Sequence, residues 1–144
     1  MKFAQFHAGQ IIEAGPYTVT EPQILAFAKE WDPQWFHTDP EAAAQGPHGG
    51  LIASGWQTCG IAMRLVAEAA LKDSESFASP GLQYVKWLKP VRPNDTLRVV
   101  ATVLEVRRSG NKPLGILRWR WQLYNQAQQE VLDLEATSLF KLGE

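Results

Sequence analysis

The sequence predicts an α+β fold in which one long central helix is wrapped by a curved five-stranded antiparallel sheet. The first observation is residues 48–71, where apolar or small side chains occupy nearly every side of a helical pattern, as in a buried helix. The second is a set of four strand-like segments after that helix, separated by turn residues. One earlier strand completes the sheet. A chain of 144 residues suits a single domain, residues 1–144.

The N-terminal part predicts one strand followed by one capped helix. Residues 10–20 are rich in strand-forming side chains and are interrupted by a Gly-Pro pair. Thr20 and Gln23 then have the spacing of a capping box, which marks a helix start. Apolar residues follow at helical spacing as far as Trp31. Asp32 precedes a proline and ends this helix, because that position avoids the α region.

The segment between the two helices, residues 32–50, is predicted to be irregular. Asp39 is a favourable N-cap for a short helix that ends at about Ala44. Two glycines then allow an unusual backbone conformation before the long helix. Ser54 is the expected N-cap of that helix.

The C-terminal half is predicted to form strands. Residues 79–81, Ser-Pro-Gly, are expected to form a loop. Between Leu117 and Leu123, apolar residues alternate with Arg and Gln, which predicts one dry and one wet face. The four expected strands cover residues 82–89, 97–106, 117–123 and 131–142.

Composition narrows the classes of function. The chain is 45% hydrophobic and 20% charged with a net charge of −1, so neither nucleic acid nor an anionic membrane is an expected partner. Arg64 and Glu68 interrupt the apolar run of the long helix, which argues against a membrane span. Cys59 is the single cysteine, and this fits a reducing compartment. The N-terminus is too polar for a signal peptide, so we expect a cytoplasmic protein.

Asp32 and His37 form the first candidate site. A carboxylate and an imidazole in one short loop can share a water molecule, with one group taking its proton and the other holding or returning one. Histidine titrates near neutrality and suits the role of base. The neighbouring aromatic residues would keep such a site dry. The alternative is that the aspartate caps a helix and the histidine is a hydrogen-bonded structural residue.

The start of the long helix is the second candidate site. Amides just after an N-cap have no helical partner, and the helix dipole adds partial positive charge there. Gly55 follows Ser54 and lets a ligand approach its N–H closely, so this amide can hold a carbonyl oxygen that becomes an oxyanion. The alternative is that these amides bind only water or a side chain, as at any helix start.

These motifs together resemble those of the MaoC-like dehydratases and (R)-specific enoyl-CoA hydratases. DPQWFHTDPEA (residues 32–42) is similar to the family pattern D-x-N-P-x-H followed by D-P-x-x-A. GGLIASG (residues 49–55) is similar to its G-x-x-[AVI]-H-G-M helix start, and PVRPNDTL (residues 90–97) to its P-V-R-P-G-D-x-L turn. The resemblance implies the hotdog fold, which agrees with the architecture expected from burial and alternation.

The resemblance also implies an activity and roles for residues. Asp32 and His37 correspond to the catalytic pair that holds water, and Gly55 to the glycine whose amide binds the thioester carbonyl. The reaction implied is reversible addition of water across the C2–C3 double bond of a 2-enoyl thioester. It requires no cofactor beyond the coenzyme A that forms part of the substrate. The residues expected to contact substrate are Trp35, Gly50, Ser54 and Trp56.

Departures from the family pattern leave two other functions open. Gln34, Trp35 and Ser54 stand where the hydratases have Asn, Pro and usually His. A hotdog acyl-CoA thioesterase is one alternative, since residues 48–50 resemble its H-G-G turn, although Glu68 is the first acid in the helix and lies too far along it. A non-catalytic acyl-thioester-binding subunit is the other.

The expected partners are an acyl-CoA substrate and a second copy of the chain. A single curved sheet leaves an open edge, and hotdog proteins of this kind usually pair two sheets edge to edge, so we predict a homodimer or a dimer-based higher oligomer. No metal site is expected, because His7, His37 and His48 lack companion ligands at useful spacing.

Overall fold

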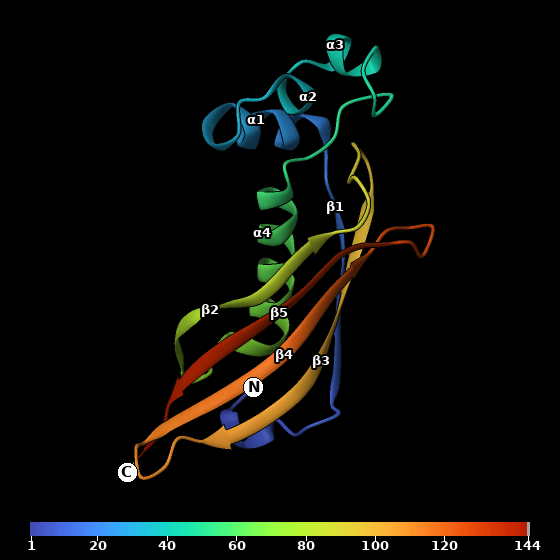
Figure 1. Ribbon diagram of the computed structural model, residues 1–144. Coiled ribbons are helices and arrows are strands. Elements are labelled where there is room, and N and C mark those ends of the chain that lie inside the picture. The colour runs from blue at the N-terminus through green and yellow to red at the C-terminus, as the bar shows by residue number, and fades with distance from the viewer. Residues whose placement is uncertain (144) are drawn as a thin grey trace.

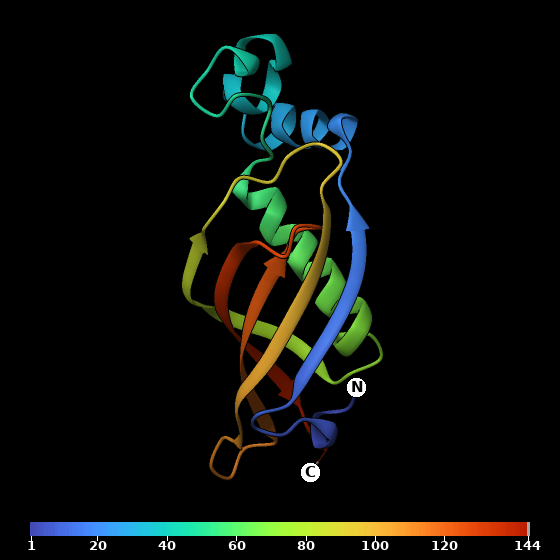
Figure 2. The same ribbon diagram turned by 90° about the vertical axis from the view of Figure 1, so that its right-hand side faces the viewer.

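The computed structural model describes residues 1–143 and contains a single curved antiparallel sheet wrapped around a central helix, the hotdog architecture predicted above. The strand order is β1-β3-β4-β5-β2. Figures 1 and 2 show the sheet curving around helix α4. The strands are β1 (Ile11–Thr18), β2 (Ser76–Trp87), β3 (Thr96–Arg108), β4 (Leu114–Tyr124) and β5 (Glu130–Lys141).

The central helix is α4 (Gly55–Val66), which continues into the π-helical segment η2 (Ala67–Leu71), giving 17 helical residues in all. Its buried side packs against the inner face of the sheet. β4 supplies much of that face, because every second residue from Gly115 to Leu123 is buried, as the alternation predicted. Trp119 is completely buried there and meets the ring of Phe6 edge-on.

Three short helices cover the end of the molecule where α4 begins (Figure 1). They are α1 (Glu21–Trp31), α2 (Trp35–Thr38) and α3 (Pro40–Ala44), and one 3-10 turn, η1 (Phe3–Gln5), lies near the N-terminus. The predicted capping box is present: the Thr20 hydroxyl accepts from the Gln23 amide, and the Gln23 side chain accepts from the Thr20 amide at 2.9 Å. Asp39 caps α3 as predicted, accepting from the amide of Ala42.

Three expectations were wrong. The one-turn helix α2 lies within residues 32–50, where the sequence predicted no helix before Asp39. Residues 79–81 do not form a loop but lie within β2, whose pairing with β5 shifts register there. β2 is an edge strand, and Pro80 lies in an irregularity of its pairing with β5 where it has no partner, so its missing N–H removes no ladder hydrogen bond. The central helix is also not buried on nearly every side, since Trp56 is 62% exposed and Met63 is 41% exposed. The sheet covers one side of the helix and leaves the other side open.

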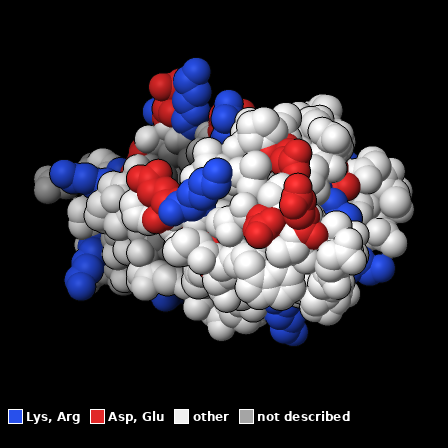
Figure 3. Space-filling view, turned by 90° about the horizontal axis from the view of Figure 1, so that it is seen from above, with Lys and Arg blue, Asp and Glu red and all other residues white. Residues whose placement is uncertain are grey.

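The surface at the α1–α3 end carries both signs of charge, interspersed with large uncharged areas (Figure 3). Among residues 1–143, no helix has the length and apolar character that crossing a bilayer requires.

Candidate active site

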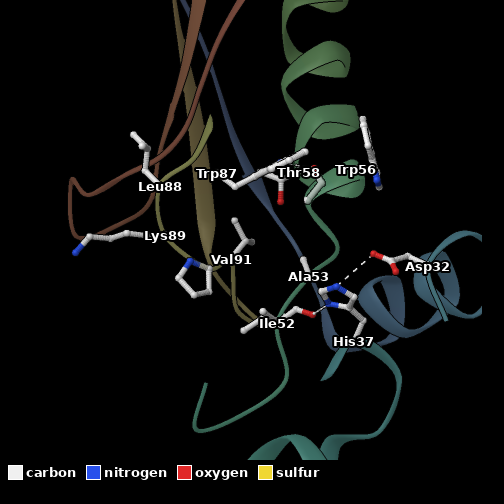
Figure 4. A pocket seen from close by; sticks show the side chains of 12 residues that line it. Asp32, His37, Ile52, Ala53, Trp56, Thr58, Trp87, Leu88, Lys89 and Val91 are labelled. Atoms are coloured by element: carbon white, nitrogen blue, oxygen red, sulfur yellow. Dashed lines mark hydrogen bonds and ion pairs between the residues drawn. The ribbon is translucent and has the colours of Figure 1, made fainter. Parts of the chain in front are cut away.

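A cavity of about 380 Å³ lies at the start of α4. The first turn of α4 forms one wall, and the chain that follows β2 forms another. Asp32, at the end of α1, and His37, in α2, contribute polar groups, and most of the remaining lining is apolar (Figure 4). The lining residues are Asp32, His37, Ile52, Ala53, Gly55, Trp56, Thr58, Trp87, Leu88, Lys89, Pro90 and Val91. A concave, largely apolar site with a few converging polar groups is typical of small-molecule binding.

The side chains of Asp32 and His37 meet at this cavity. Asp32 ends α1, and the one-turn helix α2 places His37 opposite it, with 3.3 Å between Asp32 Oδ2 and His37 Nε2. Both side chains are mostly buried, at 16% and 6% exposed respectively. The other ring nitrogen of His37 lies 2.7 Å from the carbonyl oxygen of Ile52. A carbonyl only accepts, so Nδ1 of His37 carries a proton and Nε2 is the atom presented to Asp32.

Two side chains donate hydrogen bonds to the Asp32 carboxylate. Gln34 Nε2 donates to Oδ1 at 2.7 Å, and the Ser54 hydroxyl donates to Oδ2 at 2.8 Å. Burial raises the pKa of Asp32, but the hydrogen bonds from Gln34 and Ser54 and the attraction of His37 outweigh it, so the net pKa lies below its ordinary value. Asp32 is therefore an ionised carboxylate near neutral pH.

Ser54 also organises the start of α4. It is fully buried, and its hydroxyl accepts from the amide of Trp56 while its carbonyl accepts from the amides of Gln57 and Thr58. The N–H of Gly55, the first residue of the helix, makes no hydrogen bond to any other group within residues 1–143. It is the one amide of this first turn left available to a ligand in the cavity, at the positive end of the helix dipole.

Trp87 explains by packing why residue 55 is a glycine. Its indole N–H donates to the Gly55 carbonyl at 2.9 Å. A Cβ on Gly55 would lie 2.6 Å from the indole ring, closer than real contacts allow. Figure 4 shows Trp87 reaching from the end of β2 toward the start of α4.

The structure brings some of the predicted site residues together and leaves others apart. Asp32, His37, Gly55 and Trp56 line the cavity, and Ser54 lies behind Asp32 and bonds to it. Trp35 and Gly50 do not line it. The Trp35 ring instead packs against Gly46, where an added Cβ would lie 2.6 Å from it.

Sequence reasoning missed several residues at the site. Gln34 differs from the family pattern and donates to Asp32, and a side chain two residues from an aspartate is within reach of it. The local pattern of Trp87 and residues 88–91 predicts a strand end and a turn, and nothing in it indicates that they face the start of α4. Thr58 lies one turn into the helix and also lines the cavity.

Comparison with known proteins agrees with this architecture. Residues 3–118 match the family described as "MaoC like domain". The uncharacterised protein YdeM of Bacillus subtilis is 35% identical over 98% of this chain and 99% of its own length. The 3-hydroxyacyl-thioester dehydratase Z of Mycobacterium tuberculosis is 33% identical over 65% of this chain and 64% of its own length.

The crystal structure of the MaoC-like dehydratase from Rhodospirillum rubrum superposes with a TM-score of 0.89 at 32% identity, covering 98% of this chain and 97% of that one. The sequence match extends from η1 into β4 and includes the whole cavity, and the structural match extends over nearly the whole chain. The chain thus belongs to the MaoC-like dehydratase family of hotdog proteins.

Proposed function

We propose that the protein is a hydro-lyase that adds water to, or removes it from, the C2–C3 bond of an acyl thioester of the enoyl-CoA type. The observation that carries the proposal is the placement of an Asp32–His37 pair and an unpartnered Gly55 amide around one cavity. The 3-hydroxyacyl-thioester dehydratase among the relatives supports the same class of substrate.

In the proposed reaction, His37 moves the proton. With Nδ1 protonated toward Ile52, Nε2 of the neutral ring accepts a proton from a water molecule held between it and Asp32. The resulting hydroxide adds to C3, and Asp32, kept ionised by Gln34 and Ser54, stabilises the imidazolium that forms. The imidazolium then returns the proton to C2, so that one molecule of water is added in total.

Gly55 would stabilise the charge that develops on the substrate. Addition at C3 pushes electrons onto the thioester oxygen and creates an enolate. The free Gly55 N–H at the start of α4 is positioned to donate to that oxygen, and removing a donor of this kind typically costs about 10²–10³ in rate.

The direct test offers the purified protein crotonyl-CoA and butyryl-CoA. Loss of the enoyl absorbance of crotonyl-CoA supports the hydratase. Release of free thiol from butyryl-CoA would instead indicate a thioesterase. No acidic residue of the central helix lines the cavity, and Glu68, the first acid of that helix, is exposed and pairs with Arg64 at 3.0 Å. Binding of both thioesters without either reaction would indicate the non-catalytic alternative and overturn the proposal.

Ser54→Ala tests how the carboxylate is held. The variant loses the hydroxyl that donates to Asp32, so we expect the pKa of Asp32 to rise toward its ordinary value. Turnover of crotonyl-CoA should fall by about tenfold, since a hydrogen bond to a charged group is lost. An NMR titration of the Asp32 carboxyl carbon measures the pKa, and steady-state kinetics measure the turnover.

Ser54→Thr is the matched control, because it keeps a hydroxyl on the same backbone. It should retain most of the activity and the low pKa of Asp32. An unchanged Asp32 titration in Ser54→Ala would show that this hydroxyl does not hold the carboxylate.

We also propose that two copies pair through the open side of the molecule. Large apolar side chains are exposed there on the edge strand β2 and on α4: Phe77, Leu82, Trp87 and Met63. Such exposed apolar area marks an interface. Sedimentation at micromolar concentration should give at least twice the 16.1 kDa chain mass. Leu82→Lys should weaken the pairing, and a strictly monomeric wild type would contradict it.

A further inference from the structure

A second cavity follows the first along α4. It measures about 450 Å³ and lies between the helix and the inner face of the sheet. Its lining is mainly apolar and comes from α4, β2, β4 and β5, including Cys59, Met63, Leu82, Trp121, Leu134 and Ala136. Cys59 is one helical turn beyond Gly55, which lines the first cavity, so the two cavities are consecutive on one side of the helix.

Trp87 lies at the boundary between these cavities. It lines the first, and its ring packs against Gly55, one helical turn before Cys59, which lines the second. The ring is fixed by several contacts: its N–H donates to the Gly55 carbonyl, one part of it lies against the Gly55 Cα, and Trp56 meets it edge-on at 5.4 Å between ring centroids. Burial raises the pKa of the Cys59 thiol, so this residue adds a neutral, weakly polar group to the second cavity.

The position of Trp87 beside Gly55 bears on which acyl chains the protein can bind. If the thioester oxygen binds the Gly55 amide and C3 faces the Asp32–His37 pair, an acyl chain that continues along α4 meets the indole before it reaches Cys59. The apolar space beyond suits further methylene groups. The ring, which packs against Gly55, would then lie between that space and the reacting atoms.

We propose that Trp87 is a specificity-determining residue whose indole ends the acyl pocket, so that the protein selects short acyl chains and excludes longer ones from the second cavity. The inference rests on the proposed function for the identity of the ligand as an acyl thioester. Removal of the indole joins the two cavities and lengthens the chain that the pocket accepts.

Saturated acyl-CoAs test this without catalysis, because they have no double bond to hydrate. Calorimetric titration with butyryl-, hexanoyl-, octanoyl- and decanoyl-CoA should show wild-type affinity rising and then levelling off or falling as the chain reaches Trp87. In Trp87→Ala the rise should continue by up to about fourfold for each added methylene group that is buried. Trp87→Phe keeps a ring without the N–H and should keep the wild-type limit.

Trp31→Ala is the control, since it removes a more exposed indole that lines neither cavity, and it should leave the chain-length limit unchanged. Trp87→Val replaces Trp87→Ala if the latter unfolds. An identical limit in wild type and both small variants, or no binding of any acyl-CoA, would overturn the proposal. A shifted limit in a protein that fails to hydrate crotonyl-CoA would instead refute the hydratase and retain the role of Trp87.

Discussion

Replacing His37 with glutamine is expected to lower the turnover of crotonyl-CoA by at least about 10²-fold, because the proton-transfer group is lost while the cavity keeps its shape. Glutamine can still donate to the Ile52 carbonyl, which Nδ1 of His37 now contacts at 2.7 Å, but it cannot take a proton from water. Asp32→Asn should cause a loss of similar size, since the amide carries no charge to stabilise an imidazolium. Steady-state kinetics measure both effects.

Binding separates a catalytic role from a structural one. Both variants should bind butyryl-CoA nearly as tightly as the wild type, because the apolar walls and the Gly55 amide are untouched. His7→Gln, at an exposed site near the N-terminus, is the matched control and should have wild-type turnover. If His37→Gln and Asp32→Asn turn over crotonyl-CoA at the wild-type rate, the pair takes no part in the reaction.

Most of the fold follows from local patterns in the sequence. The capping box at Thr20, the alternation of β4 and the long apolar helix each predicted the element that the structure contains. The error at residues 79–81 has a specific cause: proline and glycine usually mark loops, and only the place of β2 at the sheet edge makes them compatible with a strand. That place depends on pairing with β5, about fifty residues later in the chain, which no local pattern reveals.

The site was predictable to the extent that its residues are close in sequence. Asp32 and His37 are five positions apart, and the one-turn helix α2, which contains His37, brings their side chains together. Gln34 and Ser54 appeared in the sequence as departures from a family pattern, whereas the structure makes both of them donors to Asp32. Trp87 is separated from Gly55 by a helix and a strand, so its contact with that glycine depends on the whole sheet being wound around α4.

Gly55→Ala is the second substitution expected to have a large effect. The new Cβ would lie 2.6 Å from the Trp87 ring, so either the ring or the first turn of α4 must move. Movement of that turn displaces the Gly55 N–H, and we expect kcat for crotonyl-CoA to fall by about 10²-fold, near the lower end of the cost of losing an oxyanion donor. Thermal unfolding measured in parallel confirms that the variant is folded.

The clash can be tested by relieving it. In the Trp87→Ala background the indole is absent, so adding Gly55→Ala should cost far less than it does in the wild type, a non-additivity expected of residues in contact. Gly60→Ala is the matched control one turn later, where an added Cβ meets nothing within 4 Å and crotonyl-CoA turnover should be unchanged. If Gly55→Ala lowers turnover equally in both backgrounds, glycine is required because its backbone approaches the substrate closely, and not because of the contact with Trp87.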